Sequence, residues 1–159
     1  MRDVALAPIL LAIAAYGLLH PWLGILGWTW LSLMNPHALS WQLSSMPVAA
    51  LIGGATLLGL FLTRDRRNFF TTPETKVLIA FMLWMCVTLP FSFYFDQSFH
   101  LWNRVMKIDL MILVAMVVLY SKKHINILVW VLVGSIGFYG VKGGFFTIAT
   151  GGNFLVWGP

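Results

Sequence analysis

Charged residues are scarce in this chain. Aspartate, glutamate, lysine and arginine make up 9% of its 159 residues, whereas 60% are hydrophobic. A soluble domain is about a quarter charged, so this scarcity excludes an ordinary water-soluble domain and predicts an integral membrane protein. We expect an all-α fold, a polytopic transmembrane helix bundle, because helices satisfy their own backbone hydrogen bonds inside a bilayer.

Motifs that would define several enzyme classes are also missing. The sequence contains no phosphate-binding glycine loop, no dinucleotide fingerprint, no zinc-ligand spacing and no nucleophile elbow. The single cysteine, Cys86, lies in an apolar run and excludes an intramolecular disulfide. The net charge is +5, but the ten lysines and arginines are scattered between apolar runs rather than gathered with aromatic residues. We therefore expect no metal site and no nucleic-acid partner.

Long apolar runs separated by short polar breaks make up most of the sequence. About six of these runs fit membrane helices: 4–19, 22–34, 46–62, 77–95, 104–120 and 125–141. The first two are shorter than the ~20 residues that a perpendicular span needs. Residues 4–34 form either two short spans or one helix kinked at Pro21. We favour two spans, because a single helix would overshoot a hydrocarbon core of about 30 Å.

The end of the sequence differs from the rest. Residues 1–141 are expected to form the transmembrane helical domain, and residues 142–159 a Gly- and aromatic-rich interfacial segment. Before it, glycines recur at every third position and would form a bare helix stripe against which a neighbouring helix packs: Gly134, Gly137, Gly140 and Gly143. The last residues neither close a helix nor form a polar tail, so we expect the chain to be cut before a second membrane half.

The distribution of cations predicts the orientation of the bundle, since cytoplasmic loops are enriched in lysine and arginine. Six spans place most of the cations on one side, which is then cytoplasmic: Arg64, Arg66, Arg67, Lys76, Lys122 and Lys123. The cations left on the outer side are Arg2, Arg104, Lys107 and Lys142. Three of these lie near helix ends against the general trend, which indicates that an anionic ligand stabilises them there.

Arg104, Lys107 and Lys142 are therefore the candidate substrate-binding residues, because several convergent donors neutralise a lipid-linked phosphate or diphosphate. Arg104 and Lys107 are three residues apart and share one helix face. Asp109 lies on nearly the opposite face and needs a partner from another element. We expect it to pair with Lys142 at a similar depth in the membrane.

Three further polar residues are predicted to support this outer site: Asn35, His37 and His100. The two histidines are candidate acid–base groups, because imidazole titrates near neutral pH. The alternative for both is a capping role at the membrane interface. No catalytic residue is identified from the sequence.

Two segments carry a family resemblance. Residues 28–37 (WTWLSLMNPH) and 137–144 (GFYGVKGG), with the ending VWGP at 156–159, closely resemble the amino-terminal part of O-glycosylation ligases associated with the exosortase A system. That family is similar to O-antigen ligases and polysaccharide polymerases, which are multi-pass proteins of the bacterial inner membrane. The resemblance covers the whole chain in order, and its glycine-rich motif includes Lys142.

The resemblance implies transfer of a glycan from undecaprenyl diphosphate to an acceptor, such as an exported protein, by inverting displacement without a cofactor. The expected partners are the lipid-linked glycan, membrane lipids and the missing C-terminal half of the same protein. In this family the principal catalytic groups belong to that second half. The intact protein is thus expected to be a glycosyltransferase-type ligase, and this fragment alone to be inactive.

Two other function classes remain open. A lipid-glycan flippase or transporter half would place charges along a path through the membrane, whereas this chain keeps them near helix ends. A non-catalytic structural subunit would dock a partner on the glycine stripe. The structural role predicts that Gly137→Leu abolishes assembly while Lys142→Ala leaves function intact. The ligase role predicts that Lys142→Ala impairs function more than Gly137→Leu does.

Overall fold

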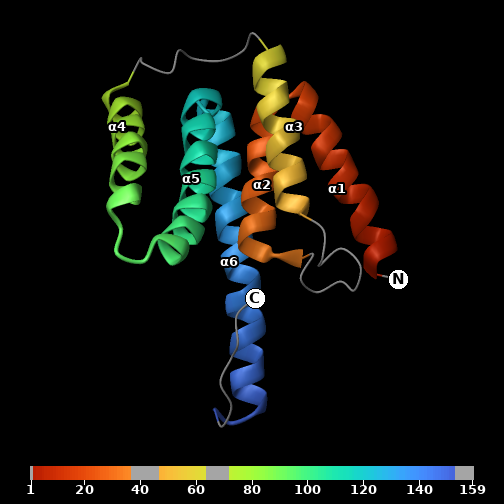
Figure 1. Cartoon of the computed structure of the whole chain (residues 1–159). Coiled ribbons are helices and arrows are strands. Elements are labelled where there is room, and N and C mark those ends of the chain that lie inside the picture. The colour runs from red at the N-terminus through yellow and green to blue at the C-terminus, as the bar shows by residue number, and fades with distance from the viewer. Residues whose placement is uncertain (1, 37–46, 64–71, 153–159) are drawn as a thin grey trace.

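The computed structural model describes residues 2–36, 47–63 and 72–152 (Figure 1). Within these ranges the chain is all-α, as predicted, with six α-helices and one 3-10 turn. The elements are α1 (Arg2–Leu19), α2 (Pro21–Met34), α3 (Val48–Leu62), α4 (Pro73–Thr88), η3 (Leu89–Phe91), α5 (Phe95–Val118) and α6 (Lys122–Ala149). Successive helices alternate in direction, so α5 begins at the end of the bundle where α2 and α4 end.

Helices α1, α2 and α3 form a closely packed unit in which small residues let the backbones approach. A Cβ atom added to Gly24 would lie 2.2 Å from Oγ1 of Thr56, and one added to Gly59 would lie 2.5 Å from the backbone oxygen of Gly17. The break between α1 and α2 is His20, which has extended backbone angles (φ −132°, ψ 90°). Residues 2–34 therefore form two helices packed against each other, and the single kinked helix is excluded.

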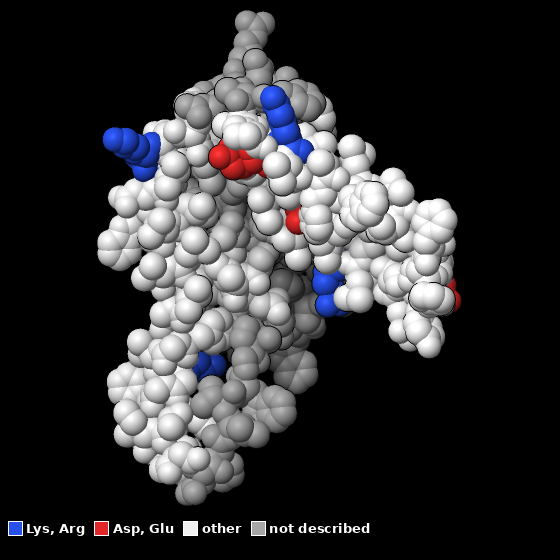
Figure 2. Space-filling view, turned by 90° about the vertical axis from the view of Figure 1, so that its left-hand side faces the viewer, with Lys and Arg blue, Asp and Glu red and all other residues white. Residues whose placement is uncertain are grey.

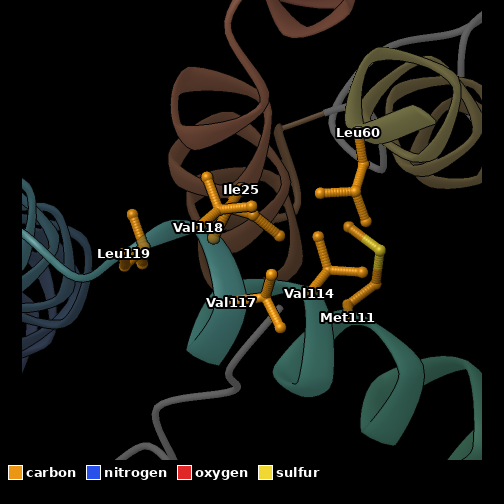
Figure 3. Packing of buried hydrophobic residues seen from close by; sticks show 7 residues of the cluster. All are labelled: Ile25, Leu60, Met111, Val114, Val117, Val118 and Leu119. Carbon is orange, nitrogen blue, oxygen red and sulfur yellow. The ribbon is translucent and has the colours of Figure 1, made fainter. Parts of the chain in front are cut away.

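A hydrophobic core joins α5 to α2 and α3. Its buried residues are Ile25, Leu60, Met111, Val114, Val117, Val118 and Leu119. In Figure 3, Leu60 of α3 points toward Met111 of α5, and Ile25 of α2 lies beside Val118. This contact fixes which face of α5 is directed into the bundle.

Helices α4 and α6 are peripheral and bury little. Thr75 is the buried residue of α4, and Ser135 that of α6. In the part of the chain that the structure describes, two segments are long and apolar enough to cross a membrane, Pro73–Phe91 and Lys122–Ala149. The segments Leu6–Leu19 and Val48–Leu62 are shorter apolar helices.

Three predicted boundaries are wrong. The helix expected over 77–95 is α4, which ends at Thr88 before the 3-10 turn Leu89–Phe91. Residues 96–103 are not a loop, because α5 already begins at Phe95. No glycine or proline interrupts residues 95–103, and the rings of Phe95, Phe99 and Trp102 stack in sequence along the helix. Helix α6 likewise continues past residue 141 to Ala149. Gly143 and Gly144 each cost the helix about 1 kcal/mol relative to alanine. The helix continues through them because the apolar residues around them offer the backbone no other hydrogen-bond partners.

Candidate anion-binding site

A polar stripe runs along the first turns of α5. Asp96, His100, Arg104 and Lys107 follow one another at intervals of four, four and three residues, so they lie on one helix face. All four side chains are exposed. The predicted loop would have separated Asp96 and His100 from the two cations, whereas the helix brings them together. Sequence reasoning did not select Asp96; the missing helix breaker after Phe95 is the signal that would have placed it here.

The polar stripe continues the side of α5 that faces the core. Met111 lies seven residues after Arg104, and Val114 seven after Lys107, which is about two helical turns in each case. Met111 and Val114 are buried in the core with α2 and α3, yet Arg104 and Lys107 are exposed. Both cations therefore lie on the core-facing side of α5, beyond the last buried residues of the core.

Lys142 lies at the same end of the bundle on α6. Three residues before it, Tyr139 donates its hydroxyl to the carbonyl oxygen of Met34, the last residue of α2. Counted from the Trp22–His124 stack, the helical rise places Lys142 about 9 Å beyond the end of α2. Ser135, Tyr139 and Lys142 are spaced by four and three residues, so Lys142 shares the α6 face that is directed toward α2.

The glycine stripe lies on the opposite face of α6. Cβ atoms added to Gly134, Gly137 or Gly140 would meet nothing within 4 Å. The prediction that these glycines pack against a neighbouring helix is therefore not met by any described helix. The face of α6 that packs on α2 is the one that carries larger side chains.

The levels of the three candidate cations along the bundle follow from two contacts and the helical rise. A Cβ atom on Gly53 would lie 3.7 Å from both Sδ of Met111 and Cδ1 of Trp28, so these two residues share a level. From this level the helical rise places Lys107 about 6 Å and Arg104 about 10 Å toward one end, and the rise from the Trp22–His124 stack places Lys142 about 18 Å toward the same end. All three cations therefore lie toward one end of the bundle, with Lys142 about 8 Å past Arg104 along its axis.

The opposite end of the bundle carries three other cations of the described helices. Lys76 lies in the first turn of α4 and Lys122 and Lys123 in the first turn of α6, and both helices begin at that end (Figure 1). In Figure 2, blue side chains lie near the top of the view and again at mid-height and below, with mostly white surface between them. The basic groups on this face are therefore separated along the bundle by apolar surface.

Asp109 does not belong to this site. Its side chain is 8% exposed, and its Oδ2 atom has no hydrogen-bond partner. The predicted ion pair with Lys142 is wrong, because Asp109 lies about 3 Å from the level of Met111 whereas Lys142 lies about 18 Å from it. Nothing in the described structure explains why Oδ2 of Asp109 is buried without a partner.

The remaining predicted residues of the outer site are Asn35, His100 and His37. Asn35 ends α2 in a left-handed conformation (φ 44°), and its backbone N–H donates to the carbonyl oxygen of Leu31. Asparagine tolerates this conformation better than most residues, so Asn35 has a helix-capping role. His100 is exposed on the polar stripe one turn before Arg104 and remains an acid–base candidate. His37 lies outside the described residues.

Contacts that hold α6 in place were not predicted. The rings of Trp22 and His124 stack with centroids 4.3 Å apart, at the opposite end of α2 from the Tyr139–Met34 hydrogen bond. Both contacts join residues about 100 positions apart, so no local sequence pattern indicates them. Among the described residues, no group of three or more His, Cys, Asp or Glu side chains could hold a metal ion.

Comparison with known proteins gives one family match. Residues 1–156 match the model of a family described as a family of unknown function, DUF5935. No curated protein and no solved structure matches the chain.

Proposed function

We propose a role in glycan transfer for this chain, which belongs to the DUF5935 family of unknown function. In this proposal it is the amino-terminal membrane domain of a ligase that moves a polysaccharide or oligosaccharide from undecaprenyl diphosphate to an acceptor. The reaction would take place at the outer face of the bacterial inner membrane. The observation that supports it is the position of Arg104, Lys107 and Lys142 toward one end of the bundle, on the sides of α5 and α6 that pack on α2 further along each helix.

The proposal requires that the helices form a six-span bundle. Its support is the amount of exposed apolar surface on the peripheral helices α4 and α6: Val77 is 69% exposed, Trp84 65% and Trp130 69%. A protein surrounded by water rarely exposes so much apolar surface, whereas lipid would cover it. With Lys76, Lys122 and Lys123 on the cytoplasmic side, the polar stripe of α5 lies on the outer side.

The chemistry of the transfer explains the need for cations. As the bond between the anomeric carbon and the diphosphate breaks, negative charge grows on the leaving oxygen, and fixed positive groups lower the energy of that transition state. The guanidinium of Arg104 offers a planar pair of donors for two phosphate oxygens, and each lysine a compact point charge. His100, one turn from Arg104, is the candidate for accepting the proton of the attacking hydroxyl group.

Arg104→Gln and Lys142→Gln test this function. Each change removes one positive charge, and we expect each to lower glycan transfer from an undecaprenyl-diphosphate donor by about 100-fold. Transfer is measured on the full-length protein in membranes from the amount of glycosylated acceptor, with thermal unfolding as the check on folding. A flippase would move the donor across the membrane and form no glycosylated product.

Lys122→Gln is the matched control. Lys122 is exposed and lies on α6 like Lys142, but at the opposite end of the bundle. Its replacement changes the net charge equally and is expected to leave transfer unchanged. Wild-type transfer in both Arg104→Gln and Lys142→Gln would contradict the proposed function.

A further inference from the structure

The turn that joins α4 to α5 exposes a cluster of aromatic rings. Phe91 ends the 3-10 turn and is 83% exposed, Phe93 is 100% exposed and Tyr94 73%, and Phe95, the first residue of α5, is 50% exposed. Figure 1 shows this turn at the lower left of the bundle, away from α1 and α3. The described helices leave these rings largely uncovered. We name the four residues the aromatic turn.

The aromatic turn lies where a candidate membrane span ends. The segment Pro73–Phe91 is long and apolar enough to cross a membrane, so Phe91 marks one end of it. Because α5 runs back along α4, the furthest point of the turn is two residues past Phe91, which is at most about 7 Å. The headgroup layer on each side of a bilayer is about 5–7 Å thick. The aromatic turn is therefore at the level of lipid headgroups.

Several polar groups of this turn are paired within the chain. The Ser92 backbone N–H donates to the carbonyl oxygen of Leu89, and the Ser98 N–H donates to that of Tyr94. The hydroxyl groups of Ser92 and Ser98 share a hydrogen bond. Internal pairing of this kind allows a backbone to enter the boundary of a bilayer, where water is scarce.

The start of α5 is amphipathic. The rings of Phe95, Phe99 and Trp102 stack along one side, with centroids 6.0 Å and 5.7 Å apart. The polar stripe lies on a neighbouring side, because Asp96 and His100 each directly follow an aromatic residue and are turned about 100° from it. A helix with one apolar and one polar side is suited to the boundary between lipid and water.

We infer that the aromatic turn and the stacked rings of Phe99 and Trp102 form a membrane-surface anchor, which inserts between phospholipid headgroups where α4 leaves the bilayer. Rings at four of the five positions 91–95 cannot all face one protein surface, whereas a fluid lipid layer surrounds them on every side. Tyrosine and tryptophan are typical of this layer, because each has an apolar ring with one polar group. The inference rests on Pro73–Phe91 as a span and not on the transfer reaction.

Hydroxyl-radical footprinting of the wild-type, full-length protein tests the anchor without any variant. Protein reconstituted at one copy per phosphatidylcholine nanodisc is oxidised, and mass spectrometry compares Phe93 and Tyr94 with the same residues in the unfolded protein. The fold leaves Phe93 wholly exposed, so its protection in a single-copy nanodisc has to come from lipid. We expect both rings to lose most of their oxidation. Oxidation equal to that of the unfolded protein would overturn the inference, as would protection that requires two copies per nanodisc.

Fluorescence quenching measures the depth of the turn. In a Cys86→Ser background, Phe93→Cys and Leu83→Cys each carry an environment-sensitive nitrobenzoxadiazole probe, and Leu83 is a 62% exposed residue near the middle of Pro73–Phe91. The vesicles contain phosphatidylcholine with a nitroxide either on the headgroup or near the end of the acyl chain. We expect the headgroup nitroxide to quench Phe93→Cys more strongly, and the acyl-chain nitroxide to quench Leu83→Cys more strongly.

Aqueous iodide separates this inference from the proposed function. Lys123→Cys, at an exposed position in the first turn of α6, is the control that iodide quenches. If iodide quenches Phe93→Cys but not Leu83→Cys, α4 is a span and the aromatic turn lies in water, which overturns the anchor and leaves the proposed function standing. If iodide quenches both, α4 is not a span, and the anchor is overturned together with the six-span bundle that the proposed function requires.

Discussion

At the scale of single residues, the glycines of this chain fall into two groups. Gly24 and Gly59 lie where helices touch, and any side chain there would meet another helix at less than 3 Å. Gly134, Gly137 and Gly140 form the more regular pattern but lie on an open helix face. The regularity of a glycine stripe therefore does not report how closely its helix is packed.

Alanine substitution distinguishes the two groups. In Gly59→Ala the new Cβ would lie 2.5 Å from the oxygen of Gly17 and 2.7 Å from that of Leu18, and a backbone cannot yield as a flexible side chain can. We expect the free energy of unfolding to fall by about 1–3 kcal/mol. Gly137→Ala should leave it unchanged or raise it by up to about 1 kcal/mol, because alanine favours a helix. Thermal unfolding in detergent measures both, and equal losses would contradict the packing described.

At the scale of elements, α6 is a long helix held by few contacts. The Trp22–His124 stack fastens its beginning to α2, and the Tyr139–Met34 hydrogen bond fastens it near the end of α2. Residues after Tyr139 extend past α2, as Figure 1 shows. The position of Lys142 therefore depends on the hydrogen bond three residues before it.

Removing that hydrogen bond should loosen the end of α6. Tyr139→Phe leaves the Met34 carbonyl without its donor and costs about 1 kcal/mol. We expect hydrogen–deuterium exchange to become faster in residues 139–149 and to stay unchanged in residues 122–135. Tyr94→Phe, at a 73% exposed tyrosine, is the control. Unchanged exchange in the end of α6 would show that the hydroxyl does not hold it.

At the scale of the whole molecule, the two ends of the bundle differ in their cations. Lys76, Lys122 and Lys123 lie at one end, and Arg104, Lys107 and Lys142 at the other. The 28 residues of α6 span about 42 Å, which exceeds a hydrocarbon core of about 30 Å. Its two ends should therefore lie on opposite sides of the membrane.

Cysteine labelling tests this orientation. In a Cys86→Ser background, Ser121→Cys and Ile148→Cys place single thiols at the two ends of α6. We expect a membrane-impermeant maleimide to label Ile148→Cys in spheroplasts with intact membranes and Ser121→Cys only after permeabilisation, since the positive-inside rule predicts that the lysine-rich end is cytoplasmic. Labelling of both from the same side would rule out α6 as a span.

Local sequence patterns predicted the helices better than the candidate site. The break at His20, the cation positions along α5 and α6, and the shared face of Arg104 and Lys107 follow from residue type and helical spacing. The Asp109–Lys142 pair failed because it needed the relative levels of two helices. The helical state of residues 96–103 was missed because polar residues were read as a loop although nothing there breaks a helix.

The sequence by itself determined the all-α class and the approximate position of each helix, because apolar runs and their breaks act over a few neighbouring residues. Only the tertiary structure decided that the glycine stripe points away from α2 and that Tyr139 ties α6 to Met34. These features depend on how one helix is rotated toward another. That rotation is set by the packing of side chains far apart in the chain, which no local pattern records.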